Sequence, residues 1–133
     1  MRQFVSAVAL TLALASPLPA QEVEIESQIR SQILAFKADD FVTAFGFASP
    51  TIQNLFRTPE NFGVMVRRGY PMVWRPGEVR FLELREIAGY QWQKVMITDG
   101  DGSVHILDYQ MVNEEGVWKI NGVQILDAGG ETA

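Results

Sequence analysis

The stretch VRFLELREIA-G-YQWQKVMIT-DGDG-SVHILDYQMV-NEEG-VWKINGVQIL, residues 79–126, decides the fold. It contains four runs rich in β-branched and aromatic residues, at 79–88, 90–98, 103–112 and 117–126, and such runs are typical of strands. The separators are short and contain glycine, which favours tight hairpins between antiparallel neighbours. Residues 79–126 therefore predict a four-stranded antiparallel meander.

Alternation along the third run indicates which side chains face the core. Asp108 and Gln110 occupy even positions, so we expect the odd positions to point inward. These are His105, Leu107, Tyr109 and Met111.

The fourth run predicts a bulge. Trp118 and Ile120 are expected to point inward, and a bulge at Asn121-Gly122 would bring Val123 and Ile125 onto the same face. The second run carries Lys94 on one face and Gln91 and Gln93 on the other, so its pattern leaves the buried face open.

Residues 25–69 show the periodicity of helices. Apolar side chains at i, i+4, i+8 and i+11 predict a first helix, and they are Ile25, Ile29, Ile33 and Phe36. After Asp39-Asp40, residues 41–48 predict a second short helix or a bent continuation of the first. Ser49-Pro50 and Thr58-Pro59 each place a capping hydroxyl before a proline. The second pair predicts a helix over 59–68, ended by Gly69 in a left-handed conformation.

Helices grouped before an antiparallel sheet predict an α+β fold, with the N-terminal helices packed on one face of a curved four-stranded sheet.

The N-terminus has the pattern of a secretory signal peptide. One positive charge precedes about a dozen uncharged residues at 4–15, the length of a signal's apolar region. A membrane-spanning helix needs roughly 20 apolar residues, and Pro17 and Pro19 interrupt any longer run. We therefore expect export to the periplasm, cleavage after Ala20 or after Ala15, and no stable membrane insertion afterwards.

The composition bounds the rest of the chain. The sequence has no cysteine, which excludes a disulfide framework and a lipid-modified N-terminal cysteine. Residues 21–128 are long enough for one hydrophobic core and predict a single domain, followed by a flexible tail at 129–133. The formal net charge is −5, and loss of Arg2 with the signal leaves −6. Nucleic-acid binding needs a basic surface, so this charge argues against nucleic acid as a partner.

One segment is distinctive, namely Ala44-Phe45-Gly46-Phe47-Ala48-Ser49-Pro50 followed by Ile52-Gln53. Together with Phe36, Asp39-Asp40, Phe56, Phe62, Met65-Val66, Gly69-Tyr70, Arg75-Pro76 and Trp118-Lys119-Ile120, it resembles a family of exported Gram-negative bacterial proteins defined as domain of unknown function 4864. The resemblance spans about residues 25–126. The order of elements is also similar to the nuclear transport factor 2-like cone, in which a bent antiparallel sheet wraps a long helix and leaves a pocket. The resemblance implies a cone-like fold and no particular function.

In such a cone, polar residues that face the pocket are candidates for catalysis. His105 is the only histidine, and with Tyr109 on the same strand face it could polarise a carbonyl, with Asp40 or Asp39 as the base. Asp40 continues the apolar line of the first helix, where burial would raise its pKa. The alternatives are a His105 at the rim beside the 99–102 turn, a Tyr109 in the core, and an Asp39 or Asp40 that caps the next helix.

A second candidate is an arginine patch, which we define as Arg67, Arg68, Tyr70, Trp74 and Arg75, with Arg80 and Arg85 nearby. Guanidinium groups beside aromatic rings could bind a carboxylate, a phosphate or an acidic partner segment. Ion pairs with Glu78, Glu83 and Glu86 would account for the same charges.

The segment Asp99-Gly100-Asp101-Gly102 has the opening spacing of a calcium loop. The next ligand position is Ser103, however, and the twelfth is Gln110 instead of glutamate. Asp-Gly is a strong turn signal, so we expect a hairpin turn here, and neither a metal nor a cofactor.

These patterns contain no catalytic motif. We therefore expect a non-catalytic periplasmic binding or accessory module that engages a small anionic molecule or an envelope protein. The alternative is a cofactor-independent lyase or isomerase acting on a small carbonyl compound, with His105, Tyr109 or an Asp39/Asp40 carboxylate lining one cavity. A structure that holds these side chains in separate places would argue against that alternative.

Overall fold

The computed structural model describes residues 18–126 of the 133. Most of the expected signal peptide and the expected tail at 129–133 lie outside the described residues. Five helices come first: α1 (Leu18–Lys37), α2 (Phe41–Gly46), α3 (Pro50–Phe56), α4 (Pro59–Gly69) and α5 (Pro71–Trp74). Four strands follow: β1 (Pro76–Ile87), β2 (Tyr90–Asp99), β3 (Val104–Glu114) and β4 (Val117–Leu126).

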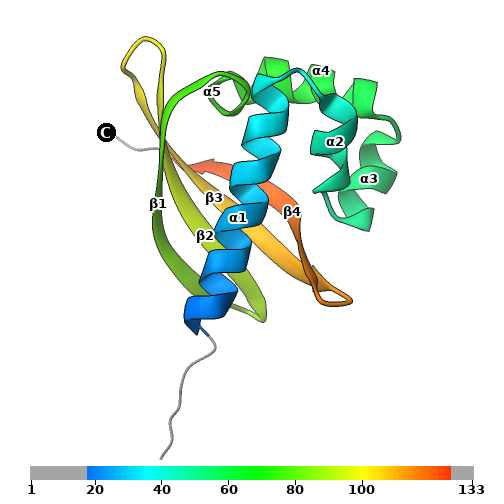
Figure 1. Ribbon diagram of the computed structural model, residues 1–133, viewed down its shortest axis with the longest axis vertical. Coiled ribbons are helices and arrows are strands. Elements are labelled where there is room, and N and C mark those ends of the chain that lie inside the picture. The colour runs from blue at the N-terminus through cyan, green and yellow to red at the C-terminus, as the bar shows by residue number, and fades with distance from the viewer. Residues whose placement is uncertain (1–17, 127–133) are drawn as a thin grey trace, which may run out of the picture.

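The sheet has the predicted topology. Its order is β1-β2-β3-β4 and every neighbouring pair is antiparallel. Figure 1 shows a curved sheet with the long helix α1 lying across it and with α2, α3 and α4 gathered at one end. The α+β, cone-like fold expected from the sequence is therefore confirmed.

The helix α1 is the centre of the core. Its predicted apolar line is almost completely buried, because Ile25 and Ile29 are 0% exposed and Phe36 is 1% exposed. Within residues 18–126, no helix combines the length and the apolar character needed to cross a bilayer.

The pairing of the strands settles which face is buried. The odd-numbered residues Gln93, Val95 and Ile97 of β2 face the helices, opposite Tyr109, Leu107 and His105 of β3. This confirms that the odd-numbered residues of β3 face inward, and it shows that the odd-numbered residues form the buried face of β2, which the sequence had left open. Asp108 was expected to face outward; it does, but Arg85 covers it with two hydrogen bonds of 2.9 and 2.8 Å, so the carboxylate is buried as an ion pair.

The predicted bulge in β4 is present. Gln110 pairs with Gly122 and Met111 with Ile120, which leaves Asn121 as the extra residue. Val123 consequently shares the inner face with Ile120. Ile125 pairs with the inward-facing Leu107 but remains 46% exposed.

The helix caps follow the sequence at two of the predicted starts. The Ser49 hydroxyl accepts a hydrogen bond from the Ile52 amide and the Thr58 hydroxyl accepts one from the Asn61 amide, each before a proline. The prediction of a left-handed Gly69 is wrong. Gly69 is the last residue of α4, and its φ is not positive. Tyr70, with φ −135°, is the residue that caps the helix. Pro71 then begins the short helix α5, which was not predicted from the sequence.

Candidate functional site

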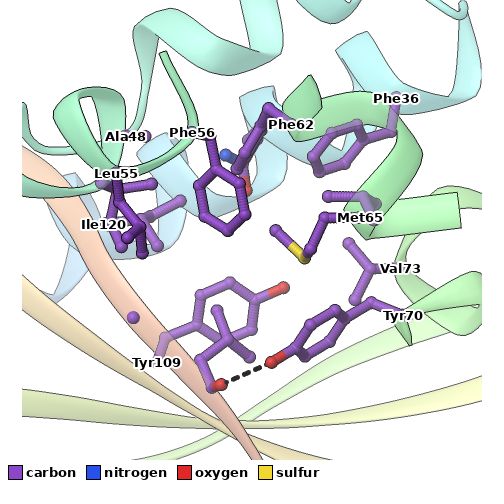
Figure 2. A pocket seen from close by; sticks show the side chains of 15 residues that line it. Phe36, Ala48, Leu55, Phe56, Phe62, Met65, Tyr70, Val73, Tyr109 and Ile120 are labelled. Carbon is purple, nitrogen blue, oxygen red and sulfur yellow. Dashed lines mark hydrogen bonds between the residues drawn. The ribbon is translucent and has the colours of Figure 1, made fainter. Parts of the chain in front are cut away.

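A cavity of about 340 Å³ lies between the helices and the inner face of the sheet. The sheet supplies Tyr109 from β3 and Ile120 and Val123 from β4, while the helices supply Phe56 from α3 and Met65 from α4. Figure 2 shows Phe56 and Met65 on the helix side, opposite Tyr109. The helices α3 and α4 therefore form one wall of the cavity, and the inner face of β3 and β4 forms the other.

The wall formed by the helices is an aromatic cluster. The Phe62 ring packs against Phe45 at 5.2 Å, Phe56 at 5.8 Å and Phe36 at 5.9 Å between ring centroids, with tilted ring planes for Phe45 and Phe36 and an edge-on arrangement for Phe56. Tilted arrangements at these separations are favourable for aromatic pairs. The cluster gives the cavity a firm apolar wall, because Phe62 and Phe36 are themselves buried.

Most polar groups of the wall are already satisfied. The Tyr70 hydroxyl donates to the Val123 carbonyl oxygen at 2.9 Å, and the Gln32 side-chain amide donates to the Ala44 carbonyl oxygen at 3.1 Å. The Tyr109 hydroxyl is different. It is buried and has no hydrogen-bond partner among residues 18–126. Burial, with a contribution from the nearby Tyr70, raises the pKa of Tyr109, so its phenol keeps its proton.

The helix α3 forms the open side of the cavity. Leu55 lines the cavity but is 67% exposed, and α3 contributes no buried residue. The start of α3 is nevertheless fixed to the sheet. The buried Ser49 hydroxyl donates to Asn121 Oδ1 at 2.6 Å, and Asn121 Nδ2 donates to Gln110 Oε1 at 2.7 Å. The bulge in β4 thus anchors the rim of the cavity.

His105 lies outside the cavity. Its Nε2 is 2.9 Å from Asp99 Oδ2, beside the turn that joins β2 and β3, as the rim alternative expected. The His105 ring and then the Ser103 amide hold the pKa of Asp99 below its ordinary value of 3.8. Asp99 Oδ1 also accepts hydrogen bonds from the Asp101 and Ser103 amides, so the Asp-Gly-Asp-Gly segment is the expected hairpin turn.

The idea of a buried Asp40 base is wrong. The helix α1 ends at Lys37, and Asp39 adopts a left-handed φ of 56°, which turns the chain before Asp40 can extend the apolar line. Asp40 is exposed and caps α2, accepting hydrogen bonds from the Thr43 hydroxyl at 2.7 Å and the Thr43 amide at 3.2 Å. These two bonds lower the pKa of Asp40 instead of raising it. The structure therefore holds His105, Tyr109 and Asp40 in separate places.

The residues of the arginine patch divide into two groups. Tyr70 belongs to the wall of the cavity, whereas Arg75 and Trp74 gather on Asp39. Arg75 Nη2 donates to both carboxylate oxygens of Asp39, at 3.0 and 3.1 Å, and the Trp74 indole donates to Oδ1 at 2.9 Å. Arg67 lies over the Phe41 ring at 5.1 Å and over the Trp74 ring at 5.9 Å.

The remaining arginine of the patch, Arg68, and the two arginines nearby pair elsewhere or are exposed. Arg85 pairs with Asp108, while Arg68 and Arg80 are exposed. Glu83, which the sequence suggested as the partner of an arginine, lies 3.8 Å from Lys94 instead. Two of the guanidinium groups are thus neutralised within the chain. In the described part of the chain, no three His, Cys, Asp or Glu side chains are grouped so as to hold a metal ion.

The contribution of α3 to the cavity was missed at the level of sequence. Ile52, Leu55 and Phe56 line the cavity, and their i, i+3, i+4 spacing places them on one helical face. An apolar face on a helix of seven residues, too short to form a core by itself, was the available signal.

Comparison with known proteins identifies the family and the fold. A family model described as "Domain of unknown function (DUF4864)" matches residues 19–133, so the chain belongs to this family. A search of curated proteins found no match. The solution structure of RPA3114, a SEC-C motif containing protein from Rhodopseudomonas palustris, is similar with a TM-score of 0.57 and 19% identity over 84% of this chain and 88% of that one. Aln2 from a Streptomyces species is similar with a TM-score of 0.52 and 16% identity over 87% of this chain and 95% of that one. At these identities the likeness concerns the fold alone.

Proposed function

We propose that this member of the DUF4864 family is a periplasmic binding module that holds a small apolar molecule in the cavity between its helices and its sheet. The observation that carries the proposal is the cavity lining. Its volume is about 340 Å³, and none of the described residues that line it is charged. Ligand pockets in proteins usually span roughly 300–1,000 Å³ and are mostly apolar, with few polar groups.

The cavity supports a binding role better than the arginine patch does. An anion site needs cationic groups that are free to pair with the ligand. Among the arginines of the patch, Arg75 already pairs with Asp39, and Arg67 lies over the Phe41 and Trp74 rings. An apolar molecule that enters the cavity, in contrast, disrupts no ion pair. Its binding is favoured by about 25 cal/mol for each Å² of apolar surface that is removed from water.

The proposed location rests on the N-terminal sequence. The uncharged run at 4–15, followed by Pro17 and Pro19, has the order of a cleavable signal. The expected product is a periplasmic protein that lacks residues 1–20 or 1–15. Intact protein found in the cytoplasm with Met1 attached would contradict the location and leave the cavity proposal untouched.

The binding proposal is tested with N-phenyl-1-naphthylamine, an uncharged probe whose fluorescence rises in apolar surroundings. Met65 lines the cavity, and Figure 2 shows its side chain directed into the open space. Met65→Trp should place a bulky ring in part of that space and weaken probe binding about tenfold or more, equivalent to at least about 1.4 kcal/mol.

The matched control is Val64→Trp. Val64 is the neighbouring residue on α4, lies outside the cavity and is 39% exposed, so this variant should bind the probe like the unchanged protein. Circular dichroism checks that both variants are folded. Equal binding by the two tryptophan variants, or no binding by the unchanged protein, would refute the proposal.

A further inference from the structure

The Tyr109 hydroxyl is a hydrogen-bond donor directed into the cavity, and it has no partner among the described residues. Tyr109 is 0% exposed and lies on β3 between its neighbours Gln93 on β2 and Val123 on β4. Figure 2 shows its oxygen pointing from the sheet into the space beneath Met65. A buried donor without a partner costs roughly 1–3 kcal/mol, so this position favours an occupant that accepts a hydrogen bond.

The rest of the lining limits the charge of that occupant. No Lys, Arg, His, Asp or Glu occurs among the described residues that line the cavity. A carboxylate or an ammonium group placed beside Tyr109 would lose its hydration without gaining a counter-ion, which is strongly unfavourable. The occupant is therefore uncharged where it meets Tyr109.

The other hydrogen-bonding groups limit its polarity. Tyr70 is committed to the Val123 carbonyl oxygen, and the Gln32 amide is committed to the Ala44 carbonyl oxygen. A carbonyl group satisfies the Tyr109 donor and brings no additional donor into the apolar cavity. An alcohol or an amide would bring an O–H or N–H that needs its own acceptor, and the other unpartnered buried atom, Gln93 Oε1, belongs to a residue that does not line the cavity.

We propose that the ligand is an uncharged, largely hydrocarbon molecule with one carbonyl oxygen, and that this oxygen accepts a hydrogen bond from Tyr109. This inference rests on the proposed binding function and specifies its ligand class. At roughly 30 Å³ per small group, a cavity of about 340 Å³ encloses on the order of a dozen non-hydrogen atoms, and a larger molecule such as N-phenyl-1-naphthylamine would extend past the exposed Leu55 on the open side. A medium-chain ketone or ester has this size and polarity.

The test compares 2-decanone with decane, which differ by one carbonyl oxygen, as competitors of N-phenyl-1-naphthylamine. Both are titrated against the unchanged protein and against Tyr109→Phe, which removes only the hydroxyl. A neutral hydrogen bond contributes about 0.5–1.5 kcal/mol, so Tyr109→Phe should weaken 2-decanone about 2- to 10-fold. The affinity of Tyr109→Phe for decane should equal or exceed that of the unchanged protein, because an unpaired hydroxyl no longer lies against the hydrocarbon.

The infrared C=O stretch of carbonyl-labelled 2-decanone gives a second readout, which a purely structural role of Tyr109 would not produce. The band should lie at lower frequency when the ketone is bound to the unchanged protein than when it is bound to Tyr109→Phe. Equal effects of Tyr109→Phe on both competitors with an unshifted band, or failure of 2-decanone to displace a bound probe, would overturn the inference and leave the binding function standing. Failure of the probe itself to bind would overturn the binding function.

Discussion

Asp39 joins three elements through a single side chain. It follows α1 and accepts hydrogen bonds from Trp74 at the end of α5 and from Arg75 just before β1. The carboxylate is half exposed, so the ion pair contributes modestly to stability. The Trp74 indole first, and the Arg75 guanidinium second, nevertheless hold the pKa of Asp39 below its ordinary value of 3.8.

This contact predicts a specific acid sensitivity. A carboxyl group whose pKa is lowered by folding contributes stability above its unfolded pKa, and this contribution is lost as the pH falls through the folded value. The free energy of unfolding should therefore decline as the pH drops below about 4. Asp39→Asn should remove part of that decline, measured by urea unfolding between pH 6 and pH 2.

Asp101→Asn is the control, because it removes an exposed carboxylate of the 99–102 turn. It should leave the pH dependence close to that of the unchanged protein. A slope that Asp39→Asn and Asp101→Asn alter equally would mean that the Trp74 and Arg75 contacts do not stabilise the ionised carboxylate.

Asp40 shows where residue patterns stop being informative. Its spacing from Phe36 fits a straight helix, and the same residue also fits a helix cap. The left-handed backbone of Asp39 decides between the two, and a left-handed aspartate is compatible with many sequences. His105 was similarly open, because strand alternation gives its face but not its distance from the cavity.

At the level of elements, α4 packs on α2 through a glycine. A Cβ atom added to Gly63 would lie 2.9 Å from Cδ1 of the Phe41 ring. Phe41 has little room to withdraw, because it is in contact with Phe36, at 6.0 Å between centroids, and lies beneath Arg67. The close approach of the two helices depends on the missing side chain.

This packing predicts opposite effects for two glycines of the same helix. Gly63→Ala should destabilise the fold by about 1–2 kcal/mol, because the cost of overpacking exceeds the gain in helix propensity. Gly69→Ala should be neutral or stabilising by up to about 1 kcal/mol, since nothing lies within 4 Å of its added Cβ. Urea unfolding of both variants measures the difference. A Gly63→Ala protein as stable as Gly69→Ala would show that Phe41 is not confined.

The elements that the sequence predicted best are those with local signals. The four strand runs and the capped prolines at 50 and 59 mark their elements within a few residues. The short helix α5 was missed because Pro71 and Pro76 have the pattern of a connecting segment. Its Met72 and Val73 are buried by contacts with the rest of the fold, which local patterns do not encode.

For the whole molecule, the sequence predicted the cone and a pocket inside it. It did not predict the hydrogen bonds that shape the pocket. The order of helices and strands predicts a sheet wrapped around α1, and Tyr109 was correctly placed on the inner face. The unpaired state of its hydroxyl could not be predicted, because the hydrogen bonds around it are long-range; the nearby Tyr70 hydroxyl, for example, donates to Val123, 53 residues away. The rim depends on a similar long-range contact, between Ser49 and Asn121.

The central claim is that the cavity beneath Met65 binds an apolar molecule. The most direct measurement is an NMR titration of protein labelled with ¹³C at the methionine methyl groups, using N-phenyl-1-naphthylamine as the ligand. Met65 lines the cavity, whereas Met96 alternates with the buried Val95 and Ile97 and lies on the outer face of the sheet. We predict a shifted Met65 methyl resonance with nuclear Overhauser effects to the ligand, and an unchanged Met96 resonance. Ligand contacts at Met96 with none at Met65 under saturating probe would contradict the account.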